Sequence, residues 1–223
     1  MCIRDRCLLE REVRVIAVEI DRDLAGLIRD RFGDRITLVE GDCLAKGRRL
    51  SPEAVSALEG AEFKLVANLP YQAASPLMAS LLMHHPECSG QWVTIQKEVV
   101  DRLVANPGTK AWGPLTAIVR AFASARRIAL LPPGCFWPAP KVTSAMAELV
   151  PCASDSRPGD PDGFARFVTK LLSQRRKQIG GILGHDITTS LGIESQTRAE
   201  TLDAGQLLEL RDHLPADHHL MQP

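Results

Sequence analysis

Four adjacent residues, Asn68-Leu69-Pro70-Tyr71, combine groups that suit chemistry at an amino group. The Asn68 side-chain oxygen and the backbone carbonyl of Leu69 can accept both hydrogens of an exocyclic amine, which aims the nitrogen lone pair at an electrophile. Pro70 has no N–H, so it adds no competing donor. Tyr71, the single tyrosine of the sequence, offers a ring on which a flipped base can stack. The alternative interpretation is an Asn-Leu-Pro turn with a Tyr in a crevice.

Polar side chains end three predicted strands: Glu19, Asp42 and Asn68. Ligands of open α/β sheets gather at the carboxyl ends of the strands. An acid at the end of the second strand of a nucleotide-binding sheet can accept both ribose hydroxyls, and an acid after the next strand can accept from an adenine amino group. Each of these residues taken alone is more often a solvated loop residue than a ligand contact.

Alternating strand and helix patterns must position these residues. Short apolar strands are predicted at 13–21, 36–39, 64–67 and 92–96, and helices at 21–32, from 51–53 onward, at 76–83 and at 97–105. Ser75 and Pro76 predict the start of the third helix as its cap and first residue. This alternation favours a parallel sheet with helices on both faces. Two further apolar segments, near 115–131 and 142–150, bracket a Pro-rich segment at 132–140.

The composition changes before the last quarter of the chain. A Pro, Asp, Ser and Gly-rich stretch predicts a linker at 153–163, between a first domain at 1–152 and a helical domain at 164–223. Amphipathic helices are expected at 164–183 and 201–214.

The overall composition is that of an ordinary globular protein. The chain has 223 residues, 27 Lys+Arg against 27 Asp+Glu, and 45% apolar residues, which excludes disordered, collagen-like and coiled-coil chains. No apolar run is long enough for a membrane span or a signal peptide, so we expect a cytoplasmic protein without a membrane partner. Six scattered cysteines predict reduced, mostly buried thiols and neither a metal site nor a disulfide framework. With zero net charge, any nucleic-acid footprint must be one face of the surface.

Five segments together resemble the ribosomal-RNA adenine dimethyltransferases: NLPY, AVEID at 17–21, EGD at 40–42, QKEVVDRL at 96–103 and FWPAPKVTS at 136–144. These enzymes use S-adenosylmethionine to convert two adjacent adenosines of small-subunit rRNA to N6,N6-dimethyladenosine. The similarity runs from about Leu8 to the end and includes SQRRK at 173–177. It implies an α/β fold, a Rossmann-like class I methyltransferase sheet with a small all-α C-terminal domain, acting as a monomer on the pre-30S particle.

The resemblance also implies roles for individual residues. Glu19 would bind the cofactor ribose, Ile20 would pack on its adenine and Asp42 would accept from the adenine amino group, with Cys43 and Asn68 completing the cofactor site. Asn68, Leu69, Pro70 and Tyr71 would hold the target adenine, and Phe136 would stack on its other side. Phe136 is otherwise a core or hinge aromatic. The expected RNA contacts are Lys97, Arg102, Lys141, Arg175, Arg176 and Lys177, although the run 175–177 is equally compatible with a solvated helix face. Because a sulfonium is an activated methyl donor, no catalytic histidine is expected.

The sequence departs from this family pattern before Glu19. The family's first strand and Gly-rich loop have no counterpart, since residues 1–25 contain no glycine and 18 residues precede Glu19. We therefore expect an amino-terminally truncated product with weak or absent cofactor binding and poor stability.

Three other functions remain open at this point. One is a non-catalytic RNA-binding assembly factor that kept the base pocket, and another is an amino-methyltransferase acting on DNA or a small molecule. A nicotinamide oxidoreductase is least supported, because it needs the same Gly-rich loop and leaves NLPY unexplained.

Overall fold

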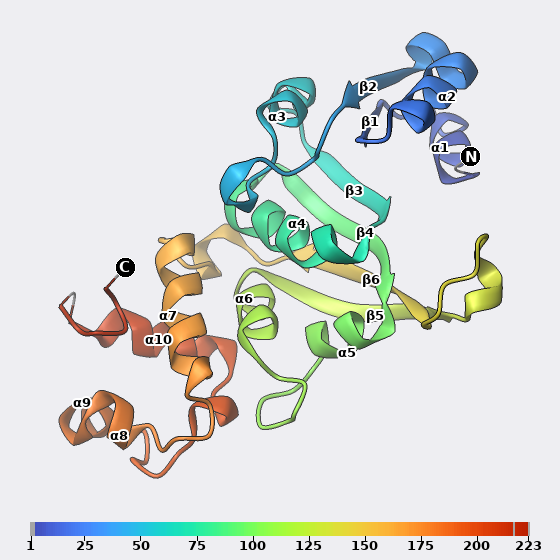
Figure 1. Cartoon of the computed structure of the whole chain (residues 1–223). Coiled ribbons are helices and arrows are strands. Elements are labelled where there is room, and N and C mark those ends of the chain that lie inside the picture. Colours follow the sequence, from blue (N-terminus) through green and yellow to red (C-terminus); the bar gives the residue numbers. More distant parts are fainter. Residues whose placement is uncertain (1–2, 216, 223) are drawn as a thin grey trace. The chain divides into compact units, whose positions relative to one another are not determined.

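The computed structural model of the chain describes residues 3–215 and 217–222, without the side chains of Ile3, Arg4 and His185. The chain divides into two compact units, Met1–Phe63 and Lys64–Pro223, which are called unit 1 and unit 2 and are described separately (Figure 1). The linker predicted at 153–163 falls inside unit 2.

Unit 1 contains the predicted strand–helix–strand arrangement. Its elements are α1 (Ile3–Leu9), β1 (Val15–Glu19), α2 (Arg22–Phe32), η1 (Gly33–Arg35), β2 (Ile36–Glu40), η2 (Lys46–Arg48) and α3 (Pro52–Leu58). β1 and β2 are parallel, with Val15 opposite Ile36 and Glu19 opposite Glu40. The parallel pairing expected from the sequence is therefore confirmed here.

The core of unit 1 is small. Val15, Phe32 and Ile36 are buried, with partly buried side chains of α1, β1 and α2 packed against them. Two large apolar side chains of the same unit are mostly exposed, Ile20 at 68% and Leu27 at 63%. Unit 1 thus buries few large apolar groups, and these supply most of the stabilisation of a folded domain.

Unit 2 is built on a second sheet. Its strands are β3 (Phe63–Asn68), β4 (Cys88–Gln96), β5 (Ala123–Leu131) and β6 (Ser144–Pro151), in the order β3-β4-β6-β5. The prediction of an entirely parallel sheet was wrong, because β6 runs antiparallel to both β4 and β5. The apolar segment near 115–131 is also divided, into α6 (Pro114–Phe122) and β5.

Side chains alternate between buried and partly exposed along β4 and β6. Val93 and Ile95 in β4 are each 1% exposed, and Ala145, Ala147 and Leu149 in β6 are fully buried. The intervening side chains are for the most part half-buried. This pattern is typical of a sheet with one covered face rather than the two that were predicted.

Three helices pack against this sheet: α4 (Tyr71–His84), α5 (Lys97–Leu103) and α6, with α6 contacting both others. α4 begins five residues earlier than predicted, and Pro70 rather than Ser75 is its N-cap. Pro76 lies inside the helix, where it removes one backbone hydrogen bond. Burial of Ala74, Leu77, Met78 and Leu81 on the same helix offsets that loss.

The C-terminal part of unit 2 is helical. It consists of η4 (Ser154–Ser156), α7 (Pro161–Ser173), α8 (Gly180–Leu183), α9 (His185–Ser190), η5 (Ala199–Thr201) and α10 (Ala204–His213). α7 packs against α6, where the Phe122 and Phe164 rings meet edge to face at 6.4 Å. The prediction of one helix over 164–183 was wrong, because α7 ends at Ser173, residues 174–176 form a turn and residue 177 is a bend.

The cysteines are free in the part of the chain that the structure describes, and Cys2 lies outside it. Only Cys88 among the five described cysteines is buried; Cys43 and Cys152 are intermediate, and Cys7 and Cys135 are exposed. The expectation of mostly buried thiols was therefore wrong. No helix in the described ranges is long and apolar enough to cross a membrane.

The unequal cores predict unequal local stability. We expect backbone amides of β1 and β2 to exchange with deuterium faster than those of β4 and β6, because local opening of unit 1 exposes less apolar surface. Exchange followed by peptide-resolved mass spectrometry measures this difference. The exchange of β5, the edge strand of the second sheet, separates an effect of edge position from one of core size. Equal protection of β1 and β6 would contradict the prediction.

Candidate functional site

The carboxyl ends of β1 and β2 carry the predicted nucleoside-binding residues. One Glu19 carboxylate oxygen accepts from the Asp21 amide at 2.9 Å, and the Glu19 carbonyl accepts from the Gly41 amide at 2.9 Å. Asp42 follows Gly41, and its carboxylate accepts from the Leu44 amide at 2.9 Å. These bonds fix the two loops at the ends of neighbouring parallel strands, where ligands of α/β sheets bind.

The side chains at this edge suit an adenosine moiety. Ile20 offers an exposed aliphatic surface to a base, while Glu19 and Asp42 offer acceptors to hydroxyl and amine hydrogens. Cys43 is half-buried beside them; burial raises the pKa of its thiol, and the Asp42 carboxylate raises it further. The Cys43 thiol is therefore harder to ionise than a free thiol.

In unit 2, the segment Asn68–Tyr71 joins β3 to α4. The Leu69 amide donates to the Thr94 carbonyl at 3.1 Å, and the Leu69 side chain is buried. The Pro70 carbonyl accepts from the amides of Ala73 and Ala74 at 3.1 and 3.0 Å. The turn is therefore held by its own backbone and by one buried side chain.

The groups predicted to receive an amine remain available on this turn. Within the described ranges, no donor bonds the Asn68 side-chain oxygen or the Leu69 carbonyl oxygen, and the Asn68 side chain is exposed. Tyr71 stands in the first turn of α4 with 44% of its surface exposed. Two acceptors and a ring thus stand on consecutive residues of a fixed turn.

Strand register brings a second segment to the same end of the sheet. Gln96 at the end of β4 pairs with Ser144, which also pairs with Leu131 at the end of β5. The Lys97 amide donates to the Thr143 carbonyl at 3.0 Å. The connection 132–143, which includes η3 (Pro133–Cys135), therefore leaves the sheet at the end where β3 delivers Asn68.

Phe136 lies in this connection. Its ring is half-buried, and its amide donates to the Pro133 carbonyl at 3.1 Å. No ring contact joins Phe136 to Tyr71 in the described structure. The neighbouring Trp137, which precedes Pro138, is 97% exposed.

The predicted RNA-contacting cations fall into two groups. The Lys97 ammonium group forms an ion pair with one Asp101 carboxylate oxygen at 2.5 Å. A terminal nitrogen of Arg127 forms a second ion pair with the other Asp101 oxygen at 3.0 Å. Arg175 bonds Glu200 and two backbone carbonyls. The other four side chains are exposed: Arg102, Lys141, Arg176 and Lys177.

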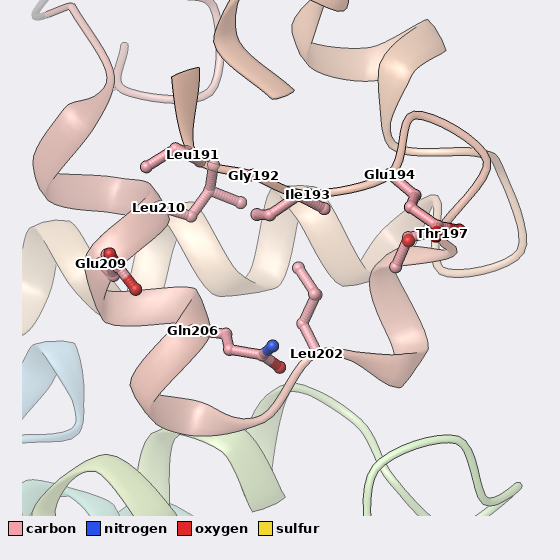
Figure 2. Close-up of a pocket in the computed structure, with 9 residues that line it drawn as sticks. All are labelled: Leu191, Gly192, Ile193, Glu194, Thr197, Leu202, Gln206, Glu209 and Leu210. Atoms are coloured by element: carbon pink, nitrogen blue, oxygen red, sulfur yellow. The ribbon is translucent and has the colours of Figure 1, made fainter. Parts of the chain in front are cut away.

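A cavity of about 290 Å³ lies between the C-terminal helices (Figure 2). Leu202 and Leu210 form part of its lining, and the Glu194 and Glu209 carboxylates lie at its sides. Its lining includes none of the predicted site residues. Across residues 3–215 and 217–222, no three His, Cys, Asp or Glu side chains are grouped to hold a metal ion.

Known proteins match this chain over most of its length. The family model described as "Ribosomal RNA adenine dimethylase" matches residues 5–215. "Ribosomal RNA small subunit methyltransferase A" of Anaeromyxobacter dehalogenans (strain 2CP-C) is 37% identical over 89% of this chain and 72% of its own length. The protein of the same name from Synechococcus sp. (strain JA-3-3Ab) is 36% identical over 93% of this chain and 76% of its own length.

Two solved structures show the same fold. A dimethyladenosine transferase from Plasmodium falciparum has a TM-score of 0.74 at 23% identity, covering 88% of this chain and 80% of its own. The 23S rRNA methyltransferase ErmE has a TM-score of 0.60 at 20% identity, covering 90% and 82%. The predicted Rossmann-like methyltransferase fold is confirmed by these matches. With the family model spanning nearly the whole sequence, the chain belongs to the ribosomal RNA adenine dimethylase family.

Proposed function

We propose that this enzyme, an rRNA adenine dimethyltransferase by family, transfers methyl groups from S-adenosylmethionine to the N6 atoms of two adjacent adenosines in small-subunit rRNA. The observation that carries the proposal is the fixed turn Asn68–Tyr71, whose two carbonyl acceptors have no donor in the described structure and precede an exposed aromatic ring. The names of the relatives support small-subunit rRNA as the substrate. The pre-30S particle in the cytoplasm is the proposed partner, and the enzyme acts as a monomer.

The turn orients the adenine amino group. The Asn68 side-chain oxygen and the Leu69 carbonyl each accept one N6 hydrogen, which draws the nitrogen lone pair out of conjugation with the ring. The bound cofactor supplies a methyl group on a positively charged sulfur. Transfer would form the N6–C bond and break the S–C bond with its electron pair left on sulfur, and the displaced N6 proton would pass to solvent. Each adenosine undergoes this transfer twice.

Aromatic residues hold the target base in this proposal. Tyr71 stacks on one face of the flipped adenine, and Phe136 approaches the other from the connection 132–143. Base–aromatic stacking contributes about 1–3 kcal/mol per base. Pro70, which lacks an N–H, keeps donors away from the amine. The rate enhancement then comes from orientation, for which well-placed reactants gain about 7–11 kcal/mol.

The residues at the ends of β1 and β2 hold the nucleoside part of the cofactor. Glu19 accepts from the ribose hydroxyls, Ile20 packs on the adenine and Asp42 accepts from its amino group, with Cys43 alongside. For the RNA backbone we propose Arg102, Lys141, Arg176 and Lys177 as phosphate contacts, which give affinity without reading sequence. Lys97 is a weaker phosphate contact in this proposal, because it must first leave its partner Asp101.

Replacing Asn68 by Ala tests the role of the turn. We expect methyl transfer from labelled S-adenosylmethionine to unmethylated small subunits to slow about tenfold to a hundredfold, as the loss of about 1–3 kcal/mol of hydrogen bonding in the transition state requires. Gln72→Ala, at an exposed position of α4 four residues on, is the matched control and should keep the wild-type rate. Wild-type activity in Asn68→Ala would refute the role of Asn68. Wild-type enzyme that binds subunits but transfers no methyl group would instead favour a non-catalytic assembly factor.

Replacing Glu19 by Gln tests the cofactor edge. We expect the dissociation constant for S-adenosylmethionine, measured by calorimetric titration, to rise about tenfold or more, because hydrogen bonds to a charged acceptor contribute about 1.5–3 kcal/mol. Glu40→Gln makes the same chemical change at the residue opposite Glu19 and should leave the constant unchanged. Equal constants for Glu19→Gln and the wild type would remove Glu19 from the site.

A further inference from the structure

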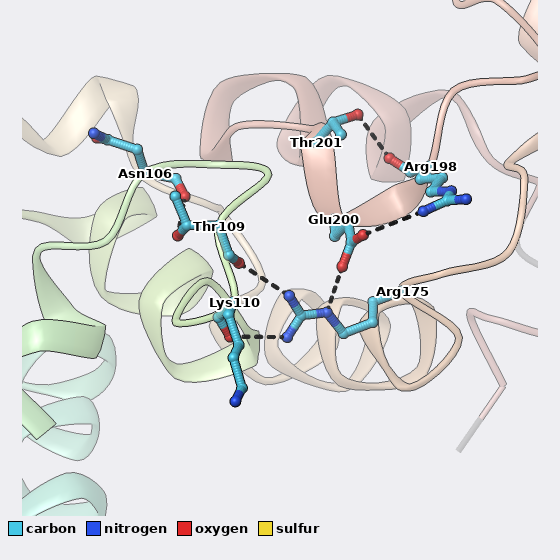
Figure 3. A network of polar contacts seen from close by, with 7 residues as sticks. All are labelled: Asn106, Thr109, Lys110, Arg175, Arg198, Glu200 and Thr201. Carbon is cyan, nitrogen blue, oxygen red and sulfur yellow. Dashed lines mark hydrogen bonds and ion pairs between the residues drawn. The ribbon is translucent and has the colours of Figure 1, made fainter. Parts of the chain in front are cut away.

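Arg175 joins three segments of unit 2 through its guanidinium group. Its Nε atom donates to a Glu200 carboxylate oxygen at 2.7 Å, and its two terminal nitrogens donate to the carbonyls of Lys110 and Thr109 at 3.3 and 3.0 Å (Figure 3). One side chain thereby links the turn after α7, the loop before α6 and η5. Arg175 and Glu200 together are called the clamp.

Backbone hydrogen bonds reinforce the clamp. The Gly108 amide donates to the Glu200 carbonyl at 2.7 Å, and the Glu200 amide donates to the Arg175 carbonyl at 3.3 Å. Gln178 and Arg198 form an antiparallel bridge between the turn and the segment before η5. The three segments therefore have fixed positions relative to one another.

The two side chains of the clamp are mostly withdrawn from solvent, with 30% of Arg175 and 15% of Glu200 exposed. All three guanidinium nitrogens of Arg175 already have acceptors. A phosphate would have to displace these acceptors to bind Arg175 directly. The geometry therefore favours a positioning role over the direct RNA contact that the sequence suggested.

Exposed cations surround the clamp on the segments that it joins. Lys110 is exposed and directs its ammonium group away from Arg175 (Figure 3). The Arg198 side chain is 59% exposed, with one terminal nitrogen 4.0 Å from Glu200. Arg176 and Lys177, which follow Arg175 directly, are exposed as well. These four residues, Lys110, Arg176, Lys177 and Arg198, are called the basic surface.

We propose that the clamp assembles the basic surface as a binding site for the RNA phosphate backbone, with Lys110 and Arg198 as phosphate contacts and Arg175 and Glu200 as positioning residues. The inference rests on the proposed function for its partner. The charges of Arg175 and Glu200 cancel within the clamp, so the four exposed cations of the basic surface add positive charge to the segments that the clamp joins. Their origin on three segments means that the phosphate spacing they match depends on the clamp.

The variant Glu200→Gln distinguishes a clamp that positions the cations from a surface that acts only through its net charge. The two models predict opposite changes in the affinity for RNA. Removing a negative charge beside RNA should tighten binding if only net charge matters. If the clamp positions Lys110 and Arg198, the same change weakens binding to unmethylated small subunits, by about five- to tenfold at about 0.1 M salt for each phosphate that is no longer bound. Glu194→Gln, an exposed acid on the segment preceding Thr197, is the matched control for charge and should bind as tightly as wild type or slightly tighter.

Single variants of the exposed cations test the surface independently of folding. We expect Lys110→Gln and Arg198→Gln each to reduce the slope of log affinity against log salt concentration by about 0.7–0.9. Arg175→Lys keeps the charge but cannot reach three acceptors, so it should weaken binding as Glu200→Gln does. Hydrogen exchange at Gly108 should accelerate in both clamp variants and stay unchanged in Lys110→Gln.

The outcomes separate this inference from the proposed function. Glu200→Gln binding as tightly as Glu194→Gln, or unchanged salt slopes in Lys110→Gln and Arg198→Gln, would overturn the inference while wild-type binding and methyl transfer persist. Wild-type protein that neither binds nor methylates small subunits would overturn the proposed function itself.

Discussion

Alternate burial along β4 and β6 is the constraint on which the rest of unit 2 depends. Val93 and Ile95 face the same covered side as Ala145, Ala147 and Leu149, and all five are essentially inaccessible to solvent. A slip of one residue would turn every buried side chain outward, so the hydrophobic pattern specifies a single register. That register aligns the end of β4 with the start of β6 and the end of β5.

The turn Asn68–Tyr71 takes its geometry from this alignment. The Leu69 amide bonds Thr94 of β4, so the strand that carries Asn68 is tied to the same register. With its backbone held and the Leu69 side chain buried, the turn can present polar groups to solvent without losing its shape. Such preorganisation matters for a transfer that relies on orientation rather than on acid–base groups. The connection 132–143 shares the alignment through Lys97 and Thr143.

The sequence predicted those features that depend on local residue types. The strand-end positions of Glu19 and Asn68 and the parallel pairing of β1 with β2 followed from apolar runs that stop at polar residues. The start of α4 was missed because Ser75-Pro76 is a good local signal for a helix start. In the structure the helix continues through this pair, because side chains before and after it are buried. The end of α7 was missed because its cause lies far along the chain: Arg175 bonds residues near 110 and 200. Strand direction in β6 depends on tertiary packing, which local patterns do not record.

Charge pairing divides the cations of unit 2 into those that already have a carboxylate partner and those that are free to bind phosphate. Lys97 and Arg127 share Asp101, and Arg175 is bound to Glu200, so each of these cations has a carboxylate partner whose displacement by phosphate carries a cost. Lys141, Arg176 and Lys177 have no such partner in the described part of the chain and stay hydrated at the surface. Phosphate binding by hydrated surface cations gains from the release of counterions without breaking an existing pair. A chain with zero net charge can therefore bind a polyanion, because its acids neutralise the cations that hold the fold and leave the others exposed.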